Sequence, residues 1–181
     1  MDIFVLSIYE VSPENAYIMD AKKNILMDGI FSKMIYVDRF FSMNGMYIHL
    51  PIEIQSIENN SYSAKLTVPL LFSANKSMAP MAMPATNKKT ITFSVVKHAY
   101  LLQQIELLEK KILDKYIPLD PNIPKIYTII QTLKFGYFRI FRESVASYKV
   151  DTPPMFILKI SGIWENSKGY GLSYKIMETS D

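Results

Sequence analysis

The sequence predicts a mainly β domain with one long helix. Runs of β-branched and aromatic residues, separated by turn residues, fill both ends of the chain, and only residues 94–116 repeat apolar side chains at helical spacing. Strand and helix patterns do not alternate, which argues against a Rossmann or α/β-barrel fold. With 181 residues the chain has the length of one ordinary domain, so we expect residues 1–181 to fold as a single unit.

The first 72 residues favour strands. Short apolar or alternating segments are bounded there by residues typical of turns, as at 12–15 and 59–61. Pro51 predicts a sheet edge or a bulge, because proline cannot donate a hydrogen bond to a neighbouring strand. The expected strands cover residues 3–9, 17–19, 30–37, 46–50, 52–54 and 62–72.

Residues 73–89 predict a flexible surface loop. They combine small residues with Pro80 and Pro84 and show no hydrophobic periodicity. Lys88 and Lys89 at the end of this segment would suit contact with a polyanion. A tolerated insertion without any function has the same composition, so both interpretations stay open.

Residues 94–116 predict the long helix. Ser94 is a candidate N-cap, and Pro118 lies just beyond the expected end. We expect Glu106 and Glu109 on the solvated side. The opposite side carries an apolar stripe, which is short for a coiled-coil seam and is therefore expected to pack on a sheet. The stripe consists of Leu101, Ile105, Leu108, Ile112 and Tyr116.

The rest of the chain predicts strands again, at residues 126–130, 137–141, 156–164 and 170–177, with a turn at 166–169. Strict alternation would place Ile160 and Trp164 on one face of their strand and Glu165 on the other. Strands, one helix and strands, in that order, are typical of the OB-fold, a small Greek-key barrel that binds oligonucleotides or oligosaccharides. A β-sandwich with one helix is the structural alternative.

The composition argues against an enzyme, a metal site or a cofactor. The chain has no cysteine and two histidines, His49 and His98, which excludes thiolate and histidine-rich metal sites. Motifs for phosphate-binding loops, dinucleotide binding and serine or zinc hydrolysis are missing. The net charge of +3 permits binding to nucleic acid without requiring it.

The sequence predicts an intracellular protein that does not enter a membrane. The first residues carry an acidic Asp2 and no basic segment of the kind that begins a signal peptide. No stretch approaches the roughly 18 apolar residues of a membrane-spanning helix.

Three segments interleave aromatic rings with lysine or arginine, which is the mixture that a single-strand binder uses. Bases stack on exposed aromatic rings, and cations follow the phosphates without reading sequence. Aromatic residues in strands also commonly form a core or cross-strand pairs, so each cluster taken alone has a structural explanation. The candidate nucleic-acid-binding residues are Lys33, Tyr36, Arg39, Phe41, Tyr47, Tyr137, Arg139, Lys159, Trp164, Lys168, Tyr170 and Lys175.

Two of these segments also resemble a known class of protein. FSMNGMYIHLPI at residues 41–52 and LKISGIWENSKGYGLSYKI at residues 158–176 resemble the single-stranded DNA-binding proteins of large DNA viruses. The resemblance implies an OB-fold core, single-stranded DNA as partner, and a role in viral DNA replication, recombination or repair inside the infected host cell. Self-association or contact with replication proteins would accompany that role. The chain ends without the long acidic tail that recruits partners in many phage and bacterial single-strand binders.

Two other functions compete with this hypothesis. A β-rich virion or assembly protein would use the aromatic residues for protein contacts, and an adaptor would bind through the helix at residues 94–116. The salt dependence of binding distinguishes the virion or assembly protein from a DNA-binding protein. Neutralising phosphates makes the affinity for DNA fall steeply with ionic strength, whereas the affinity of an aromatic protein interface responds weakly.

Overall fold

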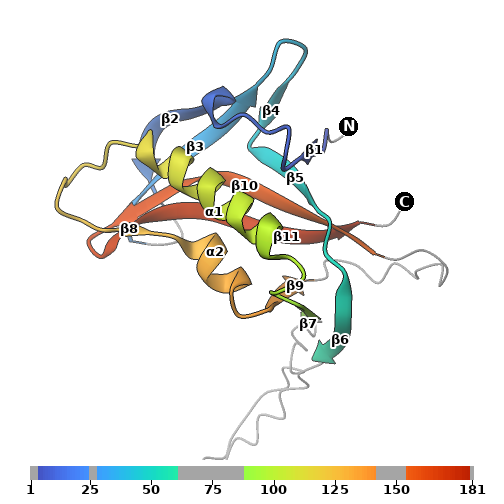
Figure 1. The fold of residues 1–181 in the computed structure, drawn as a ribbon. Coiled ribbons are helices and arrows are strands. Elements are labelled where there is room, and N and C mark those ends of the chain that lie inside the picture. Colours follow the sequence, from blue (N-terminus) through green and yellow to red (C-terminus); the bar gives the residue numbers. More distant parts are fainter. Residues whose placement is uncertain (1–3, 25–27, 61–87, 142–153, 180–181) are drawn as a thin grey trace, which may run out of the picture.

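The computed structural model describes residues 4–24, 28–60, 88–141 and 154–179, and it confirms a mainly β fold with one long helix (Figure 1). The described strands form two sheets and no closed barrel. The larger sheet contains β1 (Leu6–Ser7), β2 (Ala16–Lys23), β3 (Ile30–Val37), β4 (Ser42–Asn44), β5 (Met46–Leu50), β8 (Lys125–Ile126), β10 (Met155–Asn166) and β11 (Gly169–Thr179). The smaller sheet contains β6 (Ile54–Asn60), β7 (Lys88–Phe93) and β9 (Tyr137–Phe141). A short 3-10 helix, η1 (Pro13–Asn15), precedes β2.

β10 organises the larger sheet because it pairs along both of its edges. One edge forms an antiparallel hairpin with β11. The other edge is shared by two strands from the first half of the chain, β5 beside the start of β10 and β3 beside its end. β2 continues the sheet beyond β3. The chain turns at Pro51 and passes from β5 of the larger sheet into β6 of the smaller one.

A bulge in β10 overturns the simple alternation expected for this strand. Ile160 pairs with Tyr174 and Gly162 pairs with Ser173, so Ser161 is an extra residue and the facing pattern shifts by one. Glu165 is consequently buried, where it accepts hydrogen bonds from the Tyr116 hydroxyl at 2.7 Å and the Leu119 amide at 2.9 Å. Burial, followed by the hydrogen bond to Glu165, raises the pKa of Tyr116 to about 12. Trp164 faces the opposite side from Ile160.

The long helix α1 (Ala99–Asp114) is shorter than expected at both ends. Ser94 opens a preceding turn, in which its hydroxyl accepts from the Lys97 amide and its carbonyl accepts from the His98 amide. The His98 ring lies at the helix start and bridges the Ser94 carbonyl and the Glu53 amide. The prediction that the apolar stripe packs on the sheet is confirmed, with Leu101, Ile105, Leu108 and Ile112 all buried.

A second helix, α2 (Thr128–Leu133), occupies part of the segment that we expected to be a strand. Glu109 explains why this segment is a helix and not a strand. The prediction that Glu109 is solvated is wrong, because the residue is fully buried. Its two carboxylate oxygens accept from the amides of Ile129 and Ile130, each at 3.0 Å, and so cap the first turn of α2 from a neighbouring helix. This tertiary contact overrides the β preference of the isoleucines.

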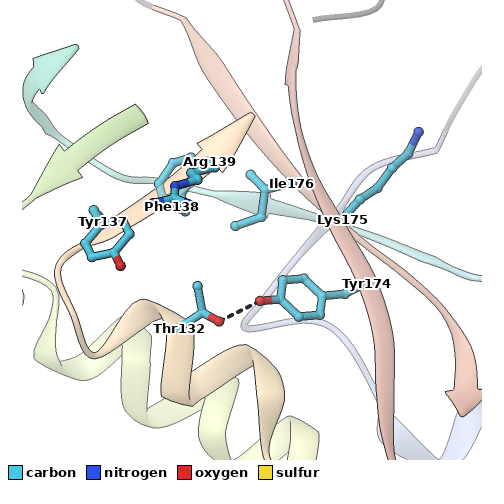
Figure 2. A pocket seen from close by; sticks show the side chains of 7 residues that line it. All are labelled: Thr132, Tyr137, Phe138, Arg139, Tyr174, Lys175 and Ile176. Atoms are coloured by element: carbon cyan, nitrogen blue, oxygen red, sulfur yellow. Dashed lines mark hydrogen bonds between the residues drawn. The ribbon is translucent and has the colours of Figure 1, made fainter. Parts of the chain in front are cut away.

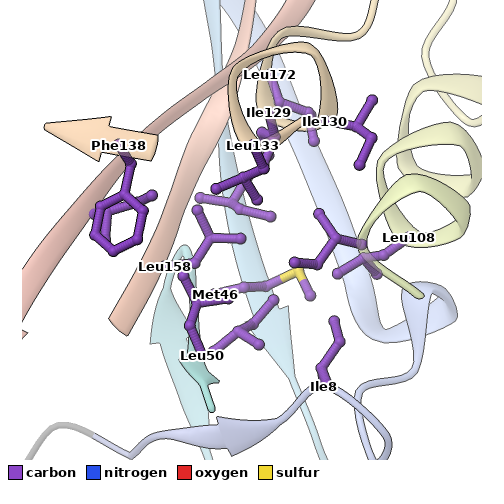
Figure 3. Close-up of a cluster of buried hydrophobic side chains, with 14 of the residues drawn as sticks. Ile8, Met46, Leu50, Leu108, Ile129, Ile130, Leu133, Phe138, Leu158 and Leu172 are labelled. Carbon is purple, nitrogen blue, oxygen red and sulfur yellow. The ribbon is translucent and has the colours of Figure 1, made fainter. Parts of the chain in front are cut away.

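One hydrophobic core joins the two helices to both sheets (Figure 3). α1 crosses one face of the β10–β11 hairpin, and α2 lies near β9 and β11 (Figure 1). Phe138 from the smaller sheet meets Phe156 from the larger one edge to face, with ring centroids 5.1 Å apart. We call the helix-covered face of the larger sheet its inner face, and the opposite side its outer face.

Several expectations concern residues outside the described ranges. The expected strand at 62–72 and nearly all of the expected loop at 73–89 lie there. Lys88 and Lys89, expected in that loop, belong to β7. Among the described residues, no helix is long and apolar enough to cross a membrane.

Candidate nucleic-acid interface

The outer face of the larger sheet carries lysines next to aromatic rings. Cross-strand register sets Tyr47, Lys159 and Lys175 in one row across β5, β10 and β11. A second row, nearer the turn of the hairpin, contains Lys22, Phe31, Trp164 and Gly171 from β2, β3, β10 and β11. Lys33 lies two residues from Phe31 on the same face. Directly opposed residues share a face, so these side chains form one surface.

The pair Lys159 and Lys175 is the most informative feature of this surface. Two like charges directly opposite one another on neighbouring strands repel and destabilise a sheet. Lys159 Nζ lies 4.9 Å from the centre of the Tyr47 ring, which stabilises this cation in part. In the described part of the chain, none of the ion pairs involves Lys22, Lys33, Lys159 or Lys175. The lysines that do form ion pairs with carboxylates are Lys89, Lys97, Lys115, Lys125 and Lys134.

Two glycines let aromatic rings lie close against the outer face. A Cβ added to Gly162 would stand 2.7 Å from Phe31 Cζ and would also overlap the Ser32 carbonyl, so the Phe31 ring covers this glycine. A Cβ on Gly171 would stand 3.0 Å from Trp164 Cζ2. Phe31 and Trp164 are partly exposed, so each presents ring surface to solvent above a glycine.

A hollow of about 700 Å³ adjoins Phe31 and Lys33. Besides these two residues it is lined by β2, whose register shifts between Ile18 and Ala21. Lys22 and Lys23 add positive charge, and Asp20 adds one carboxylate. The residues lining it are Met19, Asp20, Lys22, Lys23, Asn24, Phe31 and Lys33.

A second hollow, of about 330 Å³, lies between β9 and β11, and we call it the seam hollow (Figure 2). The Arg139 guanidinium carbon is 6.0 Å from the centre of the Tyr137 ring. The Tyr174 hydroxyl donates to Thr132 Oγ1 at 2.9 Å, and burial raises the pKa of this phenol, so it stays protonated. The seam hollow is lined by Thr132, Tyr137, Phe138, Arg139, Tyr174, Lys175 and Ile176.

Tyr36 and Tyr170 are removed from the candidate surface by their burial. Tyr36 is 1% exposed, and its hydroxyl accepts from the Ser12 amide. Tyr170 is 3% exposed on the inner face, and its ring packs against Tyr116 at 5.4 Å. The prediction that these rings stack on bases is wrong, because each contributes its surface to the core. Tyr170 and Trp164 also lie on opposite faces and do not cluster.

The structure gathers seven of the other ten candidates into two groups and leaves Phe41, Arg39 and Lys168 apart. The structure brings Lys33, Tyr47, Lys159, Trp164 and Lys175 together on the outer face, and Tyr137 and Arg139 join Lys175 at the seam hollow. Phe41 is half-buried and stacks on Phe4 with centroids 4.6 Å apart. Arg39 is exposed beside β4, and Lys168 is exposed in the turn of the β10–β11 hairpin.

The outer face includes two residues that were not among the candidates, Lys22 and Phe31. Phe31 lies one residue inside the expected strand at residues 30–37, and its spacing of two from Lys33 would have placed both on one face of that strand. The position of Lys22 opposite Phe31 depends on the register of β2 and had no signal in the sequence.

Comparison of the chain with protein-family models, with curated proteins and with solved structures returned no match. Among the described residues, no three histidine, aspartate or glutamate side chains gather where a metal ion could bind. The properties of the outer face therefore carry the functional argument.

Proposed function

We propose that this protein binds single-stranded DNA without sequence preference, through the outer face of its larger sheet. The observation that carries the proposal is the opposed pair Lys159 and Lys175. A sheet accommodates this repulsion at a cost, and a phosphate placed between the two ammonium groups would turn it into attraction.

The aromatic rings supply the second half of the interaction. Phe31 and Trp164 lie against glycines with ring surface exposed, and Tyr47 lies beside Lys159. An unpaired base offers its π-face to any such ring, so stacking favours single strands over duplexes and tolerates every base. Lysines serve as point charges along the backbone, which also reads no sequence.

We also propose that the two sheets form an OB-type barrel that is open between β9 and β11. The order of strands, helix and strands supports this, as does the single core shared by both sheets. A role in viral DNA replication, recombination or repair in the infected cell follows from the resemblance of residues 41–52 and 158–176 and belongs to the same proposal.

Titration with oligo-dT at two salt concentrations tests this function, with the fluorescence of Trp164 as the signal. Trp164 is the only tryptophan, so quenching on addition of oligo-dT reports stacking on that ring. Trp164→Ala should weaken binding by about 1–3 kcal/mol at all salt concentrations, measured by anisotropy of labelled oligo-dT. Tyr100→Ala on α1 is the matched aromatic control and should leave affinity unchanged.

Lysine variants give a second, independent signature. Lys159→Gln or Lys175→Gln should reduce the salt slope by about 0.7, the value for one phosphate of a single strand, and should lose affinity mainly at low salt. Lys111→Gln, on the exposed side of α1, should change neither quantity. Absence of oligo-dT binding at low salt would refute the proposed function.

A virion structural or assembly protein is the second candidate, and one observation favours it. The rings of Tyr9 and Tyr100 stack at 5.8 Å, each residue is more than half exposed, and Tyr100 belongs to α1, which covers the inner face. Exposed stacked aromatics are typical of protein contacts. Sedimentation velocity would show salt-insensitive self-association that Tyr100→Ser abolishes if this function is correct.

A further inference from the structure

The seam hollow lies where two sheet edges meet without pairing. In the described part of the chain, β9 pairs only with β7, and β11 beyond Gly171 pairs only with β10. The facing edges of β9 and β11 therefore carry backbone N–H and C=O groups with no partner strand between them. Thr132 of α2 lies at the inner end of the gap, next to the Tyr174 hydroxyl (Figure 2).

The wall and the mouth of the seam hollow differ in chemistry. Phe138 and Ile176 are buried and form an apolar wall, to which Tyr174 and Thr132 add a hydroxyl pair. Arg139 and Lys175 are exposed, and the Lys175 side chain leaves β11 on the side away from Tyr174 (Figure 2). Arg139 is thus the cation at the mouth of a cavity that has an apolar wall and hydroxyl groups, while Lys175 lines its rim and points toward the outer face.

We propose that the seam hollow holds one nucleotide of the bound strand, with its phosphate at Arg139 and its base inside. This inference rests on the proposed function, because Lys175 belongs both to the outer face and to the hollow and so connects the two. A volume of 330 Å³ is at the small end of ligand sites, which suits a single nucleotide.

The hydroxyl groups explain why the hollow would accept any base. The Tyr174 hydroxyl donates to Thr132, and the Thr132 hydroxyl donates to the Thr128 carbonyl at 2.9 Å, so both oxygens keep lone pairs that can accept from the N–H groups that every base carries on its edge. The Tyr137 ring beside Arg139 offers a stacking surface at the mouth. Arg139 provides the planar, bidentate geometry that suits a phosphate.

Titration of the full chain with dTMP, followed by amide NMR shifts, tests this inference. We expect shifts concentrated in β9, α2 and the second half of β11. Arg139→Gln should weaken dTMP binding about tenfold or more, because a hydrogen bond to a charged group is lost. Lys134→Gln, an exposed lysine at the end of α2, is the matched control and should bind dTMP like the wild type.

The outcomes separate this inference from the proposed function. If oligo-dT binds but dTMP shifts no amide at the seam, the nucleotide site is refuted and the function stands. If inorganic phosphate causes the same shifts as dTMP, the hollow binds only an anion, and the placement of the base is refuted. If dTMP binds at the seam and oligo-dT does not bind, the hollow is supported as a nucleotide site and the single-strand function fails. If neither binds, both proposals fail.

Discussion

Glu109 connects the two helices through a carboxylate that is fully buried. Replacing it with methionine keeps the length and the helix propensity of the side chain but removes both hydrogen-bond acceptors. The amides of Ile129 and Ile130, each 3.0 Å from a carboxylate oxygen, would then be left without partners in the core. A buried donor that loses its partner costs about 1–3 kcal/mol, so Glu109→Met should lower the free energy of unfolding by roughly 2–6 kcal/mol.

Glu106→Met is the matched control because Glu106 lies one turn away on the same helix. Its side chain is half exposed and forms an ion pair with Lys134 at 3.0 Å. Exposed pairs contribute at most about 1 kcal/mol, so this variant should remain near wild-type stability. Urea denaturation followed by circular dichroism measures both variants under the same conditions.

Hydrogen exchange locates the effect within the molecule. The amides of Ile129 and Ile130 should lose protection from exchange in Glu109→Met. Amides of the β10–β11 hairpin should lose protection only to the extent that the free energy of global unfolding falls. Equal destabilisation by the Glu106 and Glu109 variants, or unchanged protection at α2, would refute the role of Glu109 as the cap of that helix.

Three further predictions concern pH and packing. Burial raises the pKa of Glu109 above its ordinary value of 4.5. The carboxyl group of the unfolded chain therefore loses its proton at a lower pH than that of the folded protein. The stability that Glu109 contributes is full below pH 4.5 and falls as the pH rises through the raised pKa. As the pH increases from about 4 to 8, the urea midpoint of Glu109→Gln should therefore rise relative to that of the wild type. A difference between the two midpoints that stays constant with pH would contradict this. Ile105→Ala should lower the free energy of unfolding by about 2–5 kcal/mol. Leu107→Ala, on the exposed side of α1, should lower it by about 0.5 kcal/mol or less. Equal losses of melting temperature in the two variants would mean that the stripe does not face the core. Gly162→Ala should destabilise by roughly 1–3 kcal/mol, because its Cβ would meet Phe31 and the Ser32 carbonyl, and thermal unfolding as stable as that of wild type would refute this close approach.

Local patterns in the sequence were sufficient for the class of fold and for several elements. The 3.6-residue spacing of Leu101, Ile105 and Ile112 identified α1 and its buried side, since that pattern depends only on neighbours along the chain. The hairpin of β10 and β11 followed from two alternating runs around a turn at residues 166–169.

Features that depend on distant contacts could not be predicted in this way. α2 forms because Glu109, some twenty residues earlier, caps it, and no local signal distinguishes that segment from a strand. The bulge at Ser161 reverses the facing of Trp164 and Glu165, and one extra residue leaves no mark in an alternating pattern.

In the candidate site, too, local sequence identified some features and distant contacts determined the others. Lys159 and Lys175 were identified from composition, but their direct opposition appeared only with the register of the hairpin. Tyr36 and Tyr170 have the composition of a stacking site and nevertheless belong to the core, because aromatic residues in strands serve both purposes. Exposure decides between the two, and exposure depends on the whole fold.

The pairing of β10 also determines when this protein is able to fold during synthesis. β3 and β5 emerge early from the ribosome, yet the strand that completes their hydrogen bonding lies more than a hundred residues downstream. The edges of the early strands that pair with β10 therefore stay unpaired until residues 155–166 have been translated. During this period the nascent chain is prone to aggregate and is a substrate for chaperones. Such distant pairing also favours slow folding, so we expect the nascent chain to stay protease-sensitive until the ribosome has released β10.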